Sequence, residues 1–293
     1  MNRSRIQIAK PDIFRFFDEL PTRVHRLSDI RRHLSEQRAF WRLAQNTTAN
    51  HLITFLSDAG KLSKFDFPFP PPYKREIRYV WGKVSIYQVM LSLNPAAYFS
   101  HYTALRFHGL TEQLPKTTYL SVELPQISGG PGTLSQKAID IAFRRRQRTT
   151  KNVAETSDFR LCVLSAKNTR QLGVVQETVM PEYGPLRFTN LERTLIDATV
   201  RPVYSGGVFE VRKAYELAKE KVSVNRLAAF LQKLDYTYPY HQAIGFYLER
   251  AGYKPEVTSL LRRATMDFDF YLAHDMGETE YVKHWRLHVP KGF

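Results

Sequence analysis

The strongest constraint on the fold comes from a proline-rich segment, residues 68–74, that lies between two stretches of alternating apolar and polar residues. The first stretch covers residues 61–67 and the second covers residues 75–81. Alternation with a period of two is typical of β-strands, whereas prolines lack the N–H group that strand pairing requires. We therefore predict a β-hairpin whose tip is a stiff, extended loop, with Lys74 and Arg75 at its base.

Two helical patterns precede this hairpin near the start of the chain. Between Pro11 and Pro21 the apolar residues follow a helical spacing, and these prolines are expected to open and close a short helix. A second helical stripe runs over residues 27–34, with Ser28 as its expected N-cap.

A third helical pattern, over residues 46–56, combines an apolar face with a polar one. The apolar residues follow the i, i+3, i+4, i+7 spacing of one helix face: Ala49, Leu52, Ile53 and Leu56. The opposite face is small and polar, with Thr47, Asn50, His51 and Thr54. Such groups suit a helix that enters the major groove of DNA and bonds to base edges. The helices and the hairpin together predict an N-terminal winged helix-turn-helix domain over residues 1–82, whereas the alternative is a small α+β domain whose polar face contacts only water.

The charge of the chain favours a polyanionic partner. Lys and Arg total 43 against 28 acidic residues, and the formal net charge is +15. Residues 1–82 hold 15 basic and 8 acidic side chains, so an excess coincides with the polar helix face. The predicted base contacts come from Thr47, Thr48, Asn50 and His51. The predicted phosphate contacts come from Arg31, Arg32, Lys61, Lys64, Lys74 and Arg75. A generally basic protein without a nucleic-acid partner is the alternative.

Residues 83–293 are expected to form a larger C-terminal α/β domain with a mostly antiparallel sheet and a helical bundle, so that the whole chain is an α+β protein. Strand patterns, rich in β-branched and aromatic residues, cover residues 117–124, 139–145, 159–164 and 172–179. Helical patterns cover residues 85–93, 100–107, 208–219, 223–234 and 240–251. Thr189 and Glu192 match a capping box at the start of a further helix.

Four arginines stand close together where one predicted strand leaves the sheet: Arg144, Arg145, Arg146 and Arg148. They are interpreted either as a second phosphate-contacting patch or as a solvated strand end. The glycine-rich residues 129–132 lack the Gly-Lys-Ser/Thr ending of a phosphate-binding loop, so a turn is expected there.

Cysteine content and hydropathy limit the environment of the protein. The single cysteine, Cys162, excludes an internal disulfide and a cysteine-based zinc site, and it is expected in the core. The first residues lack the apolar core of a signal peptide, and the sequence has no run of about 18 apolar residues. We therefore expect a cytoplasmic protein without membrane contact.

Several short motifs follow the predicted hairpin in a fixed order. Residues 98–105 read Tyr-Phe-Ser-His-Tyr-Thr-Ala-Leu, and His-Gly-Leu-Thr follows at residues 108–111. Residues 188–197 read Phe-Thr-Asn-Leu-Glu-Arg-Thr-Leu-Ile-Asp, and they precede Arg201-Pro202 and Tyr204-Ser205-Gly206-Gly207. In this order, behind the predicted winged helix, the motifs resemble the AbiEi antitoxins of bacterial type IV toxin–antitoxin systems over roughly residues 20–235.

The resemblance implies a transcriptional autorepressor that binds inverted repeats in double-stranded DNA upstream of its own operon. It also implies that the C-terminal domain counters a co-encoded nucleotidyltransferase-like toxin without a stable complex, in phage defence by abortive infection. No enzymatic activity, cofactor or metal is implied. The candidates for antitoxin function are Arg193, Asp197, Gly206 and Gly207, although the i, i+4 spacing of Arg193 and Asp197 also suits an ordinary helix salt bridge. Inverted repeats are compatible with a monomer in solution that binds DNA cooperatively.

Two other functions stay open at this point. One is a winged-helix regulator whose C-terminal domain senses a small ligand. The other is a metal-dependent DNA-processing enzyme that uses Asp267 and Asp269, an acid-x-acid pair of the kind that holds divalent ions, with Glu280 and Lys283 downstream. The same acids also suit the wet face of a strand, which is expected over residues 266–272.

Overall fold

The computed structural model describes residues 4–125 and 134–293, and the predicted turn at residues 129–132 lies outside them. The fold mixes α-helices and β-strands, as expected. The chain forms two compact units. The first unit consists of Met1–Pro95, Ala154–Ser157 and Thr178–Pro185, and the second consists of Ala96–Val153, Asp158–Glu177 and Leu186–Phe293.

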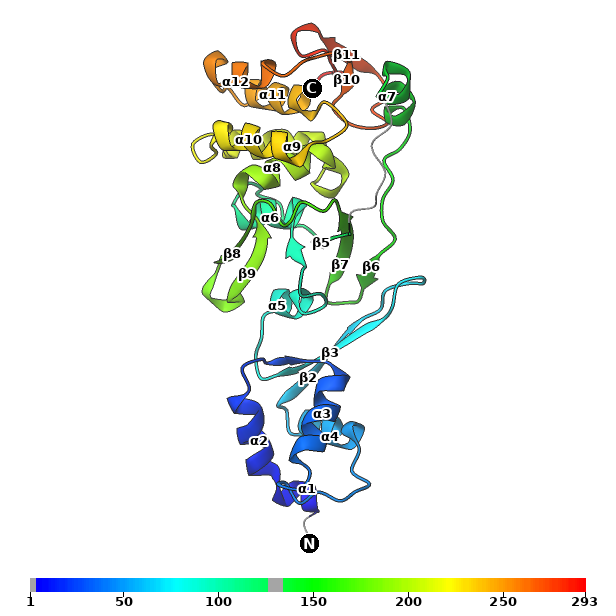
Figure 1. Ribbon diagram of the computed structural model, residues 1–293, viewed down its shortest axis with the longest axis vertical. Helices are drawn as coiled ribbons and strands as arrows, with labels where there is room; N and C mark the ends of the chain where they lie inside the picture. Colours follow the sequence, from blue (N-terminus) through cyan, green and yellow to red (C-terminus); the bar gives the residue numbers. More distant parts are fainter. Residues whose placement is uncertain (1–3, 126–133) are drawn as a thin grey trace. The chain divides into compact units, whose positions relative to one another are not determined.

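The first unit combines helices with a three-stranded antiparallel sheet of order β1-β3-β2 (Figure 1). The hairpin strands pair from Leu62 opposite Trp81 to Phe67 opposite Glu76, which confirms the predicted hairpin. The strands are β1 (Val24–His25), β2 (Leu62–Phe67) and β3 (Glu76–Trp81). The helices are α1 (Arg5–Ile8), α2 (Lys10–Glu19), α3 (Leu27–Gln37), α4 (Ala49–Asp58), α5 (Ile86–Leu91) and the 3-10 helix η1 (Pro181–Tyr183).

Local chemistry explains where these helices begin. Pro11 occupies the first turn of α2, where its missing N–H costs nothing. Helix α3 begins at Leu27 with Arg26 as its N-cap, and the Asp29 carboxylate accepts a hydrogen bond from the Arg26 N–H at 2.8 Å. The prediction of Ser28 as N-cap was wrong, because a carboxylate three residues after the cap gives a charge-assisted bond to the first free N–H.

The core of the first unit lies where α2, α3 and α4 pack on the hairpin. Its most buried apolar side chains are Ile13, Phe17, Ile30, Leu34, Leu52, Leu56 and Trp81. The indole N–H of Trp81 donates to Asp18 Oδ1 at 2.8 Å, and its ring stacks on Phe17 with 5.0 Å between centroids. Leu52 and Leu56 bring the apolar face of α4 into this core, whereas Asn50 and His51 in the same helix are exposed.

A short segment from much later in the chain completes the first unit. Gln88 Nε2 in α5 donates to the carbonyl oxygen of Tyr183 in η1 at 2.8 Å, although the two residues are 95 positions apart. The rings of Tyr87 and Tyr183 meet edge to face with 4.9 Å between centroids. The first unit is therefore discontinuous in sequence.

Two buried histidines lie side by side in this core. His25 is 1% exposed and His33 is 7% exposed, and their rings are 5.7 Å apart between centroids. Both ring nitrogens of His25 are buried without a hydrogen-bond partner among the described residues. Burial, reinforced by the charge on His33, lowers the pKa of His25 to about 4, and burial also lowers the pKa of His33.

Acidification is expected to destabilise the first unit. The unfolded chain takes up a proton on His25 near pH 6.5, whereas the folded chain takes it up only near pH 4, so stability is complete above pH 6.5 and falls as the pH decreases through this window. For His25 alone, the loss is about 2 kcal/mol at pH 5. Thermal unfolding of the full chain at several pH values checks this, and His25→Phe is expected to reduce the pH dependence. His51→Asn, at an exposed position, serves as the control, and an equal effect of both variants would contradict the assignment.

The larger sheet has six strands in the order β6-β7-β5-β4-β9-β8. Strands β5 and β7 run parallel over seven residue pairs, β4 runs parallel to β9, and β4 runs antiparallel to β5. Cys162 lies buried in β7, as expected. The strands are β4 (Tyr98–Phe99), β5 (Thr117–Glu123), β6 (Val153–Glu155), β7 (Arg160–Ala166), β8 (Val174–Thr178) and β9 (Pro185–Thr189).

One prediction about this sheet was wrong. The predicted strand at residues 139–145 is the helix α7 (Gln136–Phe143), which buries Ile139 and Phe143 four residues apart and is capped by Ser135. A helix between β5 and β7 gives the chain the length it needs to cross over and enter the sheet in the same direction. The sheet is therefore mixed, with both parallel and antiparallel neighbours.

The second unit covers its part of the sheet with a group of helices. They are α6 (His101–Phe107), α8 (Leu191–Val200), the 3-10 helix η2 (Pro202–Tyr204), α9 (Val208–Leu217), α10 (Val224–Leu234), α11 (Tyr240–Arg250) and α12 (Pro255–Arg262). Helix α8 is buried over almost its whole length. Within the described ranges, none of the helices has the length and apolar character needed to cross a bilayer.

The predicted capping box of α8 was also wrong. Its N-cap is Asn190, whose side chain accepts from the Arg193 N–H at 3.0 Å. The Glu192 carboxylate instead accepts from the Ser223 N–H at 3.0 Å and pairs with Arg226 at 2.9 Å. Because Glu192 is buried, its charge requires these partners from α10 rather than a local backbone N–H.

The end of the chain forms a third, three-stranded sheet of order β10-β12-β11, drawn in red in Figure 1. Its elements are β10 (Phe270–Tyr271), β11 (Thr279–Val282), the 3-10 helix η3 (Lys283–Trp285) and β12 (Leu287–Pro290). The predicted strand at residues 266–272 is thus only the short β10. The buried Trp285 of η3 packs against α11, where Gly245 leaves room for its ring.

Candidate functional site

The start of α4 presents the predicted base-contacting residues in two groups. Thr48 and His51 form a reciprocal capping box, in which the His51 N–H donates to Thr48 Oγ1 at 3.2 Å and the Thr48 N–H donates to His51 Nδ1 at 3.3 Å. Asn50 is exposed, whereas Thr47 is half-buried. Because His51 Nδ1 accepts a bond, the neutral imidazole carries its proton on Nε2 and has a donor left for an external partner.

Arg38 holds the loop that leads into α4. Its guanidinium donates to the carbonyl oxygens of Ala44 at 2.6 Å, of Gln45 at 3.2 Å and of Thr47 at 3.0 Å. The Arg38 guanidinium is therefore engaged within the protein. A cation with five donors suits this position because it satisfies several loop carbonyls at once.

The predicted phosphate-contacting residues are exposed, but they differ in how far their charge is already balanced. Arg31, Lys61, Lys64 and Lys74 form no ion pair within the part of the chain that the structure describes. Arg32 lies 3.8 Å from Asp29. Arg75 is paired with Asp66 across the hairpin, with 2.7 Å between Nε and Oδ1, and this hydrogen bond holds the pKa of Asp66 below its usual value. Arg75 is thus engaged in the hairpin itself.

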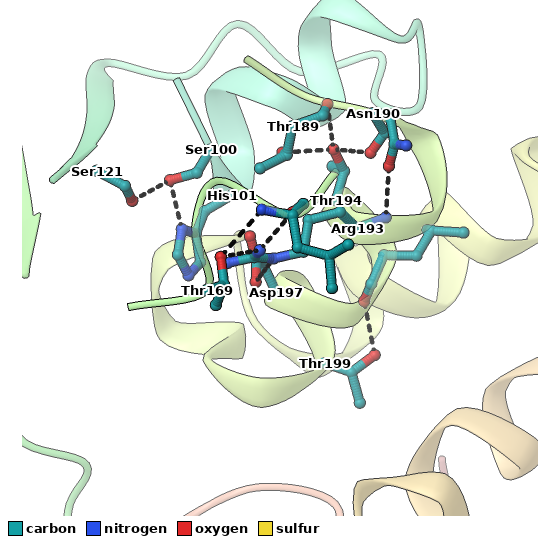
Figure 2. Close-up of polar contacts among 12 residues, drawn as sticks. Ser100, His101, Ser121, Thr169, Thr189, Asn190, Arg193, Thr194, Asp197 and Thr199 are labelled. Carbon is teal, nitrogen blue, oxygen red and sulfur yellow. Dashed lines mark hydrogen bonds and ion pairs between the residues drawn. The ribbon is translucent and has the colours of Figure 1, made fainter. Parts of the chain in front are cut away.

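Arg193 and Asp197 form a buried ion pair in α8, shown in Figure 2. Arg193 Nε donates to Asp197 Oδ1 at 2.8 Å, and the side chains are 4% and 7% exposed. One terminal nitrogen of Arg193 also donates to the Leu172 carbonyl oxygen at 2.7 Å and to Thr169 Oγ1 at 3.2 Å. Burial by itself lowers the pKa of Arg193, but the nearby Asp197 carboxylate outweighs it and the net shift is upward. The predicted salt bridge is confirmed, but it is a buried one.

A hydroxyl network surrounds the motif residues of α6. Ser100 Oγ lies 2.8 Å from His101 Nδ1 and 2.6 Å from Ser121 Oγ, and Figure 2 shows this chain of contacts. Burial lowers the pKa of His101 to about 4, so its imidazole is neutral at pH 7. His108 Nε2 donates to the Thr189 carbonyl oxygen at 2.8 Å. Both motif histidines therefore connect helix ends to the sheet.

A cavity of about 880 Å³ opens beside the Arg193–Asp197 ion pair within the second unit. Arg193 and Asp197 line it, together with three of the four clustered arginines, Arg145, Arg146 and Arg148. Arg144 and the turn Gly206-Gly207 do not line the cavity. This turn connects η2 to α9, and its two glycines have φ angles of 83° and 91°. Arg193 and Asp197 thus share a cavity with most of the arginine cluster, whereas the glycine turn is not part of that cavity.

Sequence reasoning missed the remaining cationic and aromatic residues of this cavity. Lys167, Arg201 and three tyrosines, Tyr236, Tyr238 and Tyr240, also line it. The available signals were the motif Arg201-Pro202 and the dense aromatic run Tyr-Thr-Tyr-Pro-Tyr at residues 236–240, between two predicted helices.

The two carboxylates of the acid-x-acid pair, Asp267 and Asp269, have separate surroundings and do not form a common site. Asp269 Oδ1 accepts from Arg286 Nε at 2.8 Å and from the Tyr281 hydroxyl at 2.7 Å, whereas Asp267 lines a separate cavity between α10 and α12. Glu280 Oε1 accepts from the Gly292 N–H at 3.2 Å, and Lys283 is exposed. Among the residues that the structure describes, no group of three or more His, Cys, Asp or Glu side chains is placed to hold a metal ion.

Comparison with known proteins relates the chain to a solved structure. No protein-family model matches the chain, and no curated protein matches its sequence. The crystal structure of the RV2827C protein from Mycobacterium tuberculosis superposes with a TM-score of 0.61 and 14% sequence identity, over 98% of this chain and 93% of that chain. The two chains share a fold.

Proposed function

We propose that this chain is a cytoplasmic, DNA-binding transcriptional repressor that also acts as the antitoxin of a toxin–antitoxin pair. The first unit would serve as a winged helix-turn-helix, with α4 as its recognition helix and the β2–β3 hairpin as its wing. The observation that carries the proposal is the exposed polar face of α4, which Arg38 and the Thr48–His51 capping box hold in one conformation.

The side chains divide into two roles toward double-stranded DNA. Asn50 and His51, with Thr47 and Thr48, would meet base edges, because an amide and an imidazole N–H offer directional hydrogen bonds. Arg31, Arg32, Lys61, Lys64 and Lys74 would neutralise phosphates, because their charges are exposed and largely unpaired. Arg75 would contribute less, because Asp66 already balances its charge.

The antitoxin half of the proposal rests on the resemblance to AbiEi proteins. In that reading, the protein represses its own operon by binding inverted repeats cooperatively as a monomer, and its second unit counters a co-encoded nucleotidyltransferase-like toxin without a stable complex. The motif residues Arg193 and Asp197 are buried, so we propose that they support the shape of the surface involved rather than contact a toxin.

Co-expression of the chain with the neighbouring gene product tests the antitoxin half of the proposal, since rescue of growth is expected only with the intact second unit. The proposal assigns the chain no catalytic step, cofactor or metal.

Lys64→Ala is expected to weaken binding to all DNA sequences alike and to reduce the slope of log affinity against log salt concentration by about one unit. The reason is the loss of one phosphate contact and of the counterions that it releases. Gel-shift titrations with the upstream DNA at several salt concentrations measure this slope. Lys233→Ala in α10 is the matched control, since Lys233 is also exposed. An unchanged slope for Lys64→Ala would remove that residue from the interface.

Asn50→Ala is expected to act on specificity instead. Loss of a bidentate amide contact lowers the preference for the operator over scrambled DNA by about tenfold or more, with little change in the salt slope. The measurement is the ratio of the two affinities in the same gel-shift assay. A ratio equal to that of the unmodified protein would show that α4 does not bind in the proposed way.

A further inference from the structure

The cavity beside Arg193 and Asp197 has the position of a ligand site. It lies where the carboxyl end of β7, at Ser165 and Ala166, meets α8 and the segment after α7. Ligands of α/β folds usually bind in crevices outside the carboxyl ends of parallel strands, and β7 is parallel to β5. Its volume of about 880 Å³ falls within the range that small-molecule sites occupy.

The charge around the cavity is strongly one-sided. Six cationic side chains line it against a single carboxylate, that of Asp197. Arg193 is balanced by Asp197, and Arg146 lies 3.1 Å from Asp275. Over residues 4–125 and 134–293, Arg145, Arg148 and Arg201 form no ion pair with any acidic side chain. Three unbalanced guanidinium groups around one concavity attract an anion with several charges.

The other polar groups of the cavity can donate hydrogen bonds without adding charge. His101 and His274 are kept neutral by burial, which lowers the pKa of each. Burial raises the pKa of the Tyr98 and Tyr236 hydroxyls, so both stay protonated. Lys167 Nζ donates to the carbonyl oxygens of Leu234 and Asp235, both at 2.8 Å, and thereby fixes the segment that carries the tyrosines.

We propose that this cavity binds a nucleotide with a diphosphate or triphosphate chain. Arginine forms bidentate hydrogen bonds with phosphate. A di- or triphosphate chain carries three or four negative charges, so it balances three unpaired guanidinium groups better than a ligand with a single carboxylate would. The half-buried Tyr236 and Tyr238 supply an aromatic wall for the base. The inference does not rest on DNA binding by the first unit, and it would give the second unit a ligand to sense.

Isothermal titration calorimetry of the full chain tests the proposal. ATP and GTP are titrated in EDTA, so that the phosphate chain keeps its charge, and AMP and pyrophosphate serve as comparison ligands. We expect ATP or GTP to bind at least about tenfold more tightly than either AMP or pyrophosphate. No binding of either triphosphate at about 1 mM would overturn the proposal. Pyrophosphate bound as tightly as ATP would also overturn it, because the site would then recognise the anion alone.

A pair of neighbouring arginines provides the matched variants. Arg148→Ala removes a guanidinium that lines the cavity, and it is expected to weaken triphosphate binding by about tenfold or more. Arg144→Ala removes an exposed arginine outside the cavity, and it is expected to change the affinity less than about twofold. Equal losses in both variants would overturn the assigned location. Arg201→Ala is the second test of the location, in case the segment around Arg148 rearranges.

The same variants separate this inference from the proposed DNA binding. Arg148→Ala is expected to leave the gel shift of operator DNA unchanged, and Lys64→Ala is expected to leave triphosphate affinity unchanged. Loss of duplex binding in Arg148→Ala without loss of triphosphate binding would identify the arginine cluster as a DNA contact and would overturn the nucleotide site.

Discussion

Asp197→Ala is expected to lower the free energy of unfolding by about 3–5 kcal/mol. The substitution leaves the guanidinium of Arg193 buried without its counter-charge, at a position where only 4% of its side chain is exposed. The remaining hydrogen bonds, to the Leu172 carbonyl oxygen and to Thr169, orient Arg193 but do not neutralise it. A buried, uncompensated charge is among the most costly defects that a single substitution can create.

Two comparisons make this expectation specific. Arg212 and Glu216 form an ion pair with the same i, i+4 spacing and 2.9 Å separation, but their side chains are 37% and 43% exposed. Glu216→Ala should therefore cost less than about 1 kcal/mol. The double variant Arg193→Met with Asp197→Leu removes both charges and should be far more stable than Asp197→Ala alone. Urea unfolding followed by circular dichroism measures all three, and similar costs for Asp197→Ala and Glu216→Ala would contradict the argument.

Gly245→Ala is expected to destabilise the second unit by about 2–3 kcal/mol, although alanine normally strengthens a helix. A Cβ at this position in α11 would overlap Cη2 and Cζ3 of the Trp285 ring and come within 2.8 Å of Cζ2. Trp285 is fully buried, and its Nε1 donates to Glu249 at 2.9 Å, so the ring cannot move away cheaply. Steric overlap therefore outweighs the gain of about 1 kcal/mol in helix propensity.

A double-mutant cycle tests this contact directly. In a Trp285→Leu background the ring is absent, and Gly245→Ala should then be neutral or slightly stabilising. The difference between the two backgrounds gives the coupling between residue 245 and the ring. Thermal unfolding measures it, and the same cost of Gly245→Ala in both backgrounds would show that the overlap is not its cause.

Local patterns in the sequence were sufficient for the elements with one clear period. The alternation on both sides of residues 68–74 predicted the hairpin, and the stripes of α10 and α11 predicted those helices nearly to the residue. The segment at residues 139–145 misled because its β-branched residues favour a strand. The structure buries Ile139 and Phe143 but leaves Ile141 45% exposed, and a strand would place all three on one face, so only a helix fits. Since that helix lies in the crossover between β5 and β7, the wrong element also hid the parallel pairing of these two strands.

For the candidate sites, the sequence likewise indicated groups of neighbouring residues but not which distant residues come into contact. The exposed residues of α4 and the arginines at residues 144–148 were visible in the sequence, because each group is contiguous or periodic. Nothing in one sequence shows that Arg145 and Arg148 share a cavity with Arg193, which is distant along the chain, or with the tyrosines at residues 236–240. The role of Arg38 was missed for a related reason, because a cation that satisfies backbone carbonyls has no pattern of its own.

The contact between α5 and η1 has a consequence for how the protein is made. A ribosome that adds about 5–20 residues per second needs about 5–20 s to advance from Gln88 to Tyr183, which is 95 residues later. During that interval β2 and β3 can already pair with each other, whereas α5 still lacks the carbonyl oxygen and the ring that Tyr183 provides. The growing chain therefore holds a nearly finished first unit with one uncovered side while most of the larger sheet is being synthesised, and the unit closes only when residues 181–183 emerge.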